Sequence, residues 1–260
     1  MPELPEADTI ARSLNAAVAG RRVKAARLRR RDFLKAGSPR GLATLAGQRI
    51  ESVTRRGKAV RMEFADKRLV IRLGMSGRVY LLPAGDGEPA HTHLVFELAS
   101  GTALPGCARH AGKPVPPAAD RVAFANSRRI AAGAFLLPAG EAGPLAGLGP
   151  DADRIGRREF IERLAGRRTP VKAALLNQGI LAGVGNIYAD EALFRARVRP
   201  TRRVHRTSRR RLEMLHRAVR AVMEEAIAAG GSTLPTSTPY ADARGQLGRF
   251  TDDHVAYGRY

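Results

Sequence analysis

Apolar residues near the start of the chain recur at helical spacing. Leu4, Ile10, Leu14 and Val18 are four to six positions apart and are separated mainly by polar or small residues. This spacing places their side chains on one face of a helix. Gly20 follows as a common stop signal. The pattern predicts an N-terminal helix that ends just before this glycine.

From position 23 the helical period gives way to short alternating segments bounded by Gly, Pro and Asp, which is typical of strands. We predict eight strands, at 23–28, 49–56, 59–65, 68–75, 78–82, 93–98, 121–126 and 133–138. That many short strands within about 120 residues indicate a sandwich or a barrel. The stretch 105–120 contains four prolines and no periodicity, so we expect a surface insertion there.

The second half of the chain has a helical pattern. After a Gly- and Pro-containing connection come helical stretches at 158–166, 171–179, 186–197 and 208–231. Strands first and helices afterwards predict two segregated domains of an α+β protein. We assign an N-terminal helix and eight-stranded β-sandwich to 1–147, a hinge to 148–156 and a helical domain to 157–260. The tail from Gly230 predicts a loop leading to a short ordered end.

Charge narrows the class of partner. The formal net charge is +21 and the sequence pI about 11.4, and such a field attracts polyanions, above all nucleic acid. The sign does not choose among DNA, RNA and an anionic membrane surface. Only six of the 45 basic residues are lysines, and genomic base composition can inflate arginine, but that bias does not explain the shortage of acids.

No apolar run approaches the roughly 18 residues that span a bilayer, and the start lacks the features of a signal peptide. Cys107 is the only cysteine, which excludes an intramolecular disulfide and a cysteine cluster for zinc within these residues. The sequence predicts a soluble intracellular protein with no cofactor in this chain.

The densest chemical signal is LLNQGILAGVGNIYADEALF at 175–194. Two predicted helices flank a turn with Gly179, Gly183 and Gly185, and the second helix begins at or just after Asn186, a good N-cap type. Free N–H groups at such a turn favour an anion, and a nucleic-acid phosphate would fit there. The alternative is an ordinary helix hairpin whose glycines only permit close packing.

Four motifs carry a family resemblance: MPELPE at the N-terminus, RRGKAV at 55–60, RLGMSG at 72–77 and the helix pair at 175–194. Occurring in this order across almost the whole chain, they resemble formamidopyrimidine-DNA glycosylase and its relative endonuclease VIII, with PELPE closer to the former. The resemblance implies that the helix pair is the family's helix, two-turn, helix (H2TH) DNA-binding motif.

The resemblance gives the first residues a chemical role. If Met1 is removed, Pro2 presents a secondary amine whose pKa near 8 lies below that of lysine, and attack on a sugar C1′ forms a cationic iminium. Glu3 beside it is implied to move protons during catalysis. Without the resemblance, Pro2 and Glu3 would be ordinary helix-start residues. Glu6 and Asp8 are still interpreted in that way.

Three further residues match family contacts to the DNA backbone. Lys58 follows Gly57 in a predicted turn and matches the catalytic lysine, so a role in contacting phosphate and assisting base removal is implied. Lys172 matches a phosphate contact, and Asn186 matches the residue that binds the backbone beside the scissile site.

A base inside a duplex must be extruded before its sugar can react, and the gap must then be filled. Met75 matches the family's first wedge residue and Arg128 the arginine that pairs with the orphaned base. Ile130 occupies the third position, where the family typically has an aromatic residue. Considered alone, Met75 would be expected in the core.

The chain departs from the family pattern at its end. It stops at VAYGRY, close to where the family continues into a four-cysteine zinc finger, so zinc is expected only if such a finger follows Tyr260. Tyr257 matches a tyrosine near the DNA phosphates, and about 231–250 corresponds to the flexible loop that covers the flipped base.

The resemblance implies a bifunctional DNA glycosylase and AP lyase of base excision repair, acting on oxidised bases such as 8-oxoguanine and formamidopyrimidines and cleaving the strand by β,δ-elimination. Its partner would be damaged double-stranded DNA. We expect a monomer, cytoplasmic and nucleoid-associated in a bacterium, with no membrane contact. Two alternatives stay open: a non-cleaving protein that binds lesions or abasic sites, and a ribosome-associated RNA binder.

Overall fold

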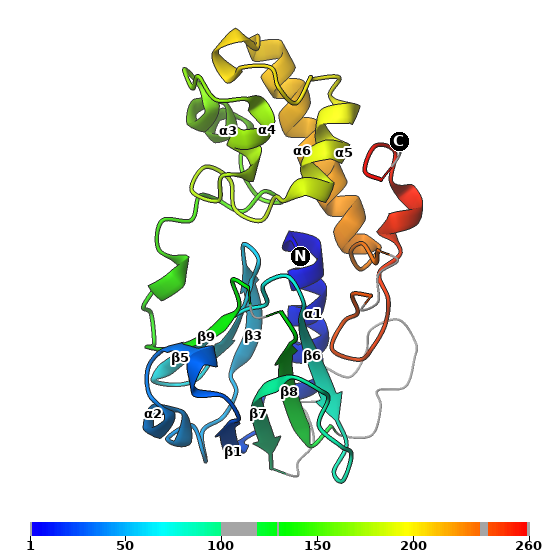
Figure 1. Ribbon diagram of the computed structural model, residues 1–260. Coiled ribbons are helices and arrows are strands. Elements are labelled where there is room, and N and C mark those ends of the chain that lie inside the picture. Colours follow the sequence, from blue (N-terminus) through cyan, green and yellow to red (C-terminus); the bar gives the residue numbers. More distant parts are fainter. Residues whose placement is uncertain (1, 100–118, 129, 235–238, 259–260) are drawn as a thin grey trace.

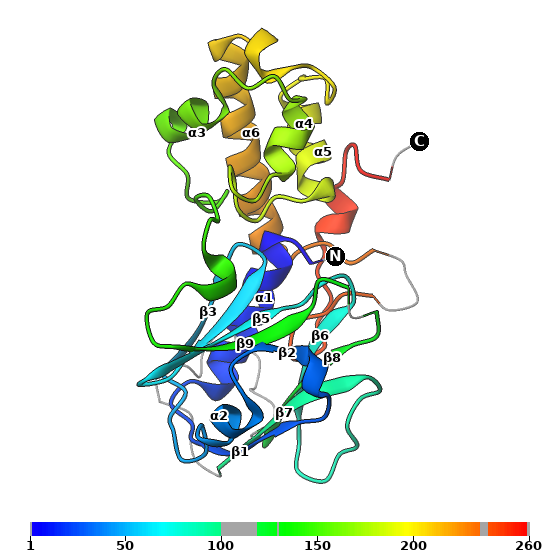
Figure 2. The same ribbon diagram turned by 60° about the vertical axis from the view of Figure 1, so that its left-hand side comes forward.

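The fold is taken from a computed structural model that describes residues 2–99, 119–128, 130–234 and 239–258. Figures 1 and 2 show a strand-rich lobe at one end, the helices α3 to α6 at the other, and α1 between them. This arrangement confirms the prediction of an α+β protein with an N-terminal helix, a sandwich-like domain and a helical domain.

Helix α1 (Leu4–Val18) belongs to both lobes. Its first residue, Leu4, lies in the hydrophobic core of the helical lobe, whereas Ile10, Leu14 and Val18 lie in the core of the sandwich. The predicted spacing and the predicted end of this helix are both correct. Because one helix contributes to two cores, the start of the chain is held rigidly where the lobes meet.

In the described residues nine strands, rather than the predicted eight, form two sheets. The four-stranded sheet has the order β1-β7-β8-β6 and the five-stranded sheet the order β2-β9-β5-β4-β3. The strands are β1 (Val23–Leu28), β2 (Leu34–Ala36), β3 (Ser52–Arg56), β4 (Ala59–Glu63), β5 (Lys67–Arg72), β6 (Gly77–Leu82), β7 (Thr92–Leu98), β8 (Arg121–Asn126) and β9 (Gly133–Pro138).

The additional strand is β2. Its three residues are too few to show the period-2 pattern by which strands are found in a sequence, and it forms one edge of its sheet by pairing in parallel with β9. The short helix α2 (Pro39–Ala43), whose N-cap Ser38 accepts a hydrogen bond from the Gly41 amide, also lies in this unpredicted stretch. All other strand pairs are antiparallel.

Side chains from both sheets and from α1 fill the sandwich core, among them the fully buried Phe64, Phe96 and Phe124. The stretch 100–118, which includes Cys107 and most of the predicted insertion, lies outside the described residues.

The helical lobe contains the four helices that the sequence predicts. They are α3 (Arg157–Leu164), α4 (Val171–Leu176), α5 (Asn186–Arg195) and α6 (Arg209–Ala228). The apolar face of α6 packs against α5, α3 and α1. Among the described residues, no helix is long and apolar enough to span a bilayer.

The tail is an irregular segment, as predicted, and it ends in a short 3₁₀ helix at Phe250–Asp253. Phe250 is fully buried in the helical core. Residues 235–238, within the predicted lesion loop, lie outside the described part.

Candidate active site

Glu3 caps a helix that lies more than 180 residues away in sequence. Its Oε2 accepts a hydrogen bond from the Gly185 amide at 2.6 Å, and its Oε1 accepts one from the Ile187 amide at 3.0 Å. Gly185 is the N-cap of α5, so the carboxylate occupies the position where helix N-termini bind anions. Glu3 is 3% exposed, and the residue beside Pro2 is therefore fixed in one orientation.

Burial changes the acidity of this carboxyl. Desolvation raises the pKa of Glu3 from 4.5 to about 7; the charge of Lys58 and the two backbone hydrogen bonds oppose the rise, and nearby Glu6 adds to it. A carboxyl with a pKa close to neutral can both donate and accept a proton at physiological pH, which is what general acid–base catalysis requires.

Lys58 faces the same pair of acids from the β3–β4 turn. The side chain is half-buried, and this burial lowers the pKa of Lys58. The negative charges of Glu3 and Glu6 have the opposite, smaller effect on this pKa. Its neighbour Gly57 has a φ of 56° and donates its amide to Asp151 Oδ1 at 2.8 Å. The structure thus brings the predicted catalytic lysine into the electrostatic environment of Glu3.

A buried arginine fixes this turn against both lobes. The side chain of Arg55 is 3% exposed and lies within 3.2 Å of three carboxylates, those of Asp8 on α1 and of Asp151 and Asp153 in the connection between the lobes. Arg56 also pairs with Asp151, at 2.7 Å. Asp8 is consequently more than the first-turn helix charge that the sequence indicated.

Glu6 forms a second buried polar group directly behind Glu3. It accepts hydrogen bonds from the Glu3 amide at 2.7 Å, the Ser232 amide at 2.8 Å and the Tyr188 hydroxyl. The Ser232 hydroxyl is in turn 2.9 Å from His254 Nε2. Desolvation raises the pKa of Glu6. From the sequence Glu6 is expected only to stabilise the helix, and no sequence pattern points to Tyr188, Ser232 or His254.

Three backbone amides at the glycine-rich turn already donate hydrogen bonds to side chains of the protein itself. Glu3 takes the amides of Gly185 and Ile187, and the Gly183 amide donates to Gln178 Oε1 at 2.9 Å. These three amides are therefore occupied within the protein, and a phosphate contact at this turn stays a prediction. A Cβ at Gly185 would overlap the Glu3 carboxyl group, so the glycine permits the close approach that the capping contact needs.

Asn186 lies one position later than the N-cap role that the sequence predicted. It is the first residue of α5, and its side chain is exposed to solvent. The distant Glu3 carboxylate supplies the cap, which leaves the Asn186 side chain available for an external partner.

Lys172 on α4 forms an ion pair. Its Nζ lies 2.7 Å from Asp190 Oδ1 and 2.9 Å from Oδ2, and both side chains are roughly one-third exposed or less. This pair links the two helices of the H2TH hairpin. Lys172 is connected to the start of α5, where Asn186 lies, only by way of Asp190 on that helix. The structure therefore does not bring Lys172 into the cluster around Glu3.

Two turns of the sandwich bring the predicted wedge residues together. The Ser76 hydroxyl contacts Asn126 Oδ1 at 3.0 Å and accepts the Arg128 amide at 2.9 Å. Met75 is 44% exposed and Ile130 57% exposed, two of the few large apolar side chains left in solvent. The carbonyl of Ile130 lies against Gly74, so these residues share one edge of the lobe.

Tyr257 lies in a segment that a buried carboxylate organises. Glu191, on α5 and fully buried, accepts the amides of Val255, Ala256 and Tyr257 at 2.8–3.2 Å. The ring of Tyr257 packs edge-on against His254, with 5.8 Å between centroids. The segment that follows the predicted loop is thereby attached to the helix that Glu3 caps.

Comparison with known proteins decides the family. Residues 1–111 match the N-terminal domain of formamidopyrimidine-DNA glycosylase, and residues 146–238 match its H2TH domain. Together these matches cover most of the chain. The protein belongs to the formamidopyrimidine-DNA glycosylase family.

Individual family members match along the full length of the chain. The formamidopyrimidine-DNA glycosylase of Cereibacter sphaeroides (strain ATCC 17029) is 40% identical over 272 residues, covering 100% of this chain and 89% of that protein. That of Bacillus subtilis is 34% identical over 265 residues, with coverages of 100% and 88%.

The fold agrees with solved structures of the family. A variant of the Lactococcus lactis glycosylase in complex with Fapy-dG-containing DNA superposes with a TM-score of 0.84 at 25% identity, covering 99% of this chain and 88% of that one. A complex of the L. lactis protein with abasic-site DNA gives a TM-score of 0.83.

The family's zinc finger does not fit the residues present. A finger of four cysteines needs three more than this sequence contains, and no group of three or more His, Cys, Asp or Glu side chains suited to a metal occurs in the described ranges. No step of the chemistry below uses a metal.

Proposed function

We propose that this member of the family is a bifunctional DNA glycosylase and AP lyase that removes oxidised bases from duplex DNA. The observation that carries the proposal is the Glu3 site: a buried carboxyl with a pKa near 7, directly beside Pro2, and facing a half-buried lysine. A protein that only binds DNA has no need for such an acid next to its N-terminal residue.

Removal of Met1 would convert the Pro2 nitrogen into a secondary amine with a pKa near 8, so a useful fraction is unprotonated at neutral pH. The nitrogen lone pair attacks C1′ of the damaged nucleotide. The bond from C1′ to the base breaks, and the base leaves with the proton that the Pro2 nitrogen loses. Glu3 protonates the sugar ring oxygen as the ring opens, which leaves a cationic iminium between Pro2 and C1′.

The iminium then acts as an electron sink. It acidifies the C2′ proton, and loss of that proton expels the 3′ phosphate; a second elimination expels the 5′ phosphate, and hydrolysis of the iminium regenerates Pro2. Glu3, now ionised, is placed to take up protons in these steps. Lys58 would contact a phosphate of the reacting nucleotide and keep the developing negative charge stabilised.

Damaged DNA would lie against the edge where the lobes meet. Asn186 would contact the backbone there, and Lys172 would reach a phosphate by exchanging its partner Asp190. Met75, Arg128 and Ile130 would fill the gap left by the extruded nucleotide, with Arg128 facing the orphaned base. Tyr257 would lie near the DNA phosphates, and the stretch 231–250 would cover the flipped base.

The two other functions differ in what they require of the site. A non-cleaving lesion binder and an RNA binder could both use the basic surface, but neither would use an N-terminal amine next to an acid of shifted pKa. The proposed enzyme would act as a monomer on bacterial DNA in the cytoplasm.

Borohydride reduction tests the proposal. Protein with confirmed removal of Met1 is incubated with duplexes that contain 8-oxoguanine or an abasic site, and sodium borohydride is added. We expect a covalent adduct on both duplexes and strand cleavage without borohydride. Binding without any adduct or cleavage would support the lesion binder, and preference for RNA over all damaged duplexes would support the RNA binder.

A further inference from the structure

The end of the helical lobe farthest from the sandwich is unusually basic. The sequence contains no Asp or Glu at 163–189 or at 192–212, and the second stretch holds nine arginines. The two stretches lie side by side, because Pro170 bridges Arg203 and the His205 amide donates to the Arg167 carbonyl. Figure 1 shows the start of α6 at the end of the helical lobe farthest from the sandwich.

Most of these arginines have no acidic partner. Arg209 pairs with Glu213 and Arg195 with Glu225. The remaining exposed arginines here have no carboxylate within ion-pair distance in the described part of the chain. We call them the distal basic surface: Arg167, Arg168, Arg197, Arg199, Arg203, Arg206, Arg210 and Arg211.

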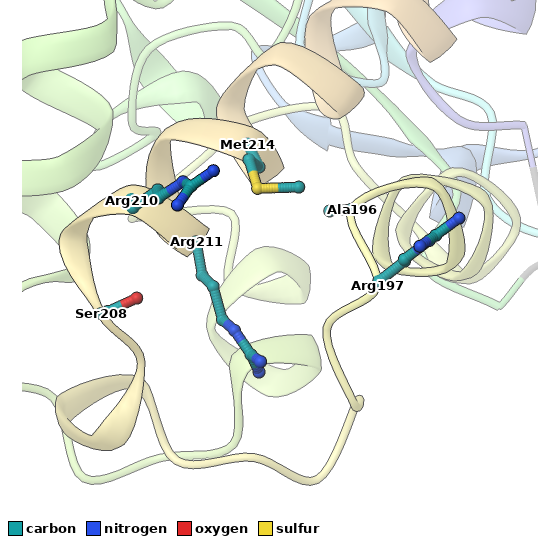
Figure 3. Close-up of a pocket in the computed structure, with 6 residues that line it drawn as sticks. All are labelled: Ala196, Arg197, Ser208, Arg210, Arg211 and Met214. Carbon is teal, nitrogen blue, oxygen red and sulfur yellow. The ribbon is translucent and has the colours of Figure 1, made fainter.

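A shallow pocket gives this surface a defined shape. It lies between the end of α5 and the start of α6, has a volume of about 380 Å³, and is lined by three arginines together with Ala196, Ser208 and Met214. Figure 3 shows the Met214 side chain turned toward Ala196 and Arg211 extended along the opening. Arg197 adopts a φ of 52°, a conformation uncommon for residues other than glycine.

The distal basic surface is separate from the active site. Helix α6 has 20 residues and is therefore about 30 Å long. Its far end contacts α1, where Arg12 donates to the Ile227 carbonyl. Since the Debye length at physiological salt is about 8 Å, Arg210 and Arg211 at the start of α6 attract anions independently of Glu3. Arg199 is nearer to the bound DNA, because the neighbouring Pro200 carbonyl accepts the Lys172 amide.

We propose that the distal basic surface binds the phosphate backbone of a second segment of duplex DNA, in addition to the segment in the active site. Duplex DNA carries one charge per about 1.7 Å of axis, so a spread of unpaired guanidinium groups fits a duplex better than a single small anion. Binding of this kind is independent of sequence and depends strongly on salt. It would keep the protein associated with DNA away from lesions and does not depend on the proposed chemistry.

The test variant reverses the charge of Arg197, Arg210 and Arg211 to Glu. Binding of a fluorescein-labelled, undamaged duplex of about 40 base pairs is followed by anisotropy over a range of salt concentrations. We expect affinity at low salt to fall about tenfold or more, and the slope of log K against log salt to decrease by about 3, near 0.9 for each lost phosphate contact. These side chains are exposed, so the fold should be retained.

A control variant carries the same charge change at the opposite end of the molecule: Lys24→Glu, Arg31→Glu and Arg40→Glu, all exposed on the sandwich. It should weaken binding less than about twofold. Equal loss in both variants would overturn the proposal, because net charge alone would then explain the effect. Unchanged binding in the first variant, or weakened binding of duplex RNA only, would also overturn it.

Borohydride trapping on a duplex of about 13 base pairs separates this proposal from the previous one. The first variant should form the adduct as wild type does. If wild type forms no adduct while the binding difference persists, the glycosylase proposal fails and the second DNA surface stands.

Discussion

Replacing Glu3 with Gln tests the physical state of the proposed catalytic acid. In the folded protein the pKa of Glu3 is raised from 4.5 to about 7, mainly by burial. In the unfolded chain the carboxyl titrates near 4.5. Between these values the folded state holds a proton that the unfolded state has lost, so the stability of wild type falls as pH rises through this window. Below pH 4.5 the contribution of this group is fully present.

The size of the effect follows from the shift. One pKa unit corresponds to about 1.4 kcal/mol, and integration between pH 5 and pH 8 gives a loss of about 2.5 kcal/mol in wild type. Gln has no such titration. It also places an NH₂ group against one of the two amides of α5, which costs about 1–3 kcal/mol at every pH. The free energy of unfolding of the variant, relative to that of wild type, should therefore rise by about 2.5 kcal/mol from pH 5 to pH 8.

Urea unfolding at both pH values measures this difference. Glu162→Gln on α3 is the control, since its carboxylate is 59% exposed and pairs with the exposed surface residue Arg158 on the same helix. Its difference from wild type should stay constant. If the Glu3→Gln difference changes by less than about 0.5 kcal/mol, the carboxyl does not titrate in this window and its role as a proton donor near neutral pH is refuted.

Three further substitutions address the contacts around this acid. Gly185→Ala should displace the Glu3 carboxyl, which lowers the free energy of unfolding by about 1–3 kcal/mol and adduct formation at least tenfold. Gly156→Ala, where a Cβ meets nothing within 4 Å, should leave both quantities unchanged. Equal effects of the two substitutions would contradict the steric argument. Glu191→Gln should lower the free energy of unfolding by about 2 kcal/mol and speed proteolysis at 255–258, and an unchanged cleavage rate would show that the carboxylate does not hold this segment. Lys58→Gln should slow base removal. It should also move the alkaline limb of the pH–rate profile to higher pH, because Lys58 lowers the pKa of Glu3. A limb that moves to lower pH would show that Lys58 does not lower this pKa.

The sequence predicts the fold well where the signal is periodic. Helix α1, the four helices of the second lobe and all strands longer than three residues follow from hydrophobic spacing. Strand β2 is missed because three residues carry no period, and it forms only because β9 offers an edge with which to pair.

The sequence predicts the site less completely, because its key contacts join distant positions. The Asn186 amide side chain was expected to cap α5, since local cap rules consider only neighbouring residues; the actual cap comes from Glu3, 182 positions from Gly185. The hydrogen bond from the Ser232 amide to Glu6 cannot be predicted from local patterns for the same reason, because the two residues are 226 positions apart. Composition favours Met75 in the core, and its exposure is visible only in the structure.

Locating the trapped sugar on the chain tests the central claim most directly. The borohydride-reduced adduct with abasic duplex is digested with nuclease and protease, and the modified peptide is sequenced by mass spectrometry, with Pro2→Gly protein in parallel. We expect a deoxyribose-derived mass on the N-terminal peptide, attached to Pro2, and much less adduct in the variant. An adduct on Lys58 or another lysine, or an equal yield from the variant, would contradict it.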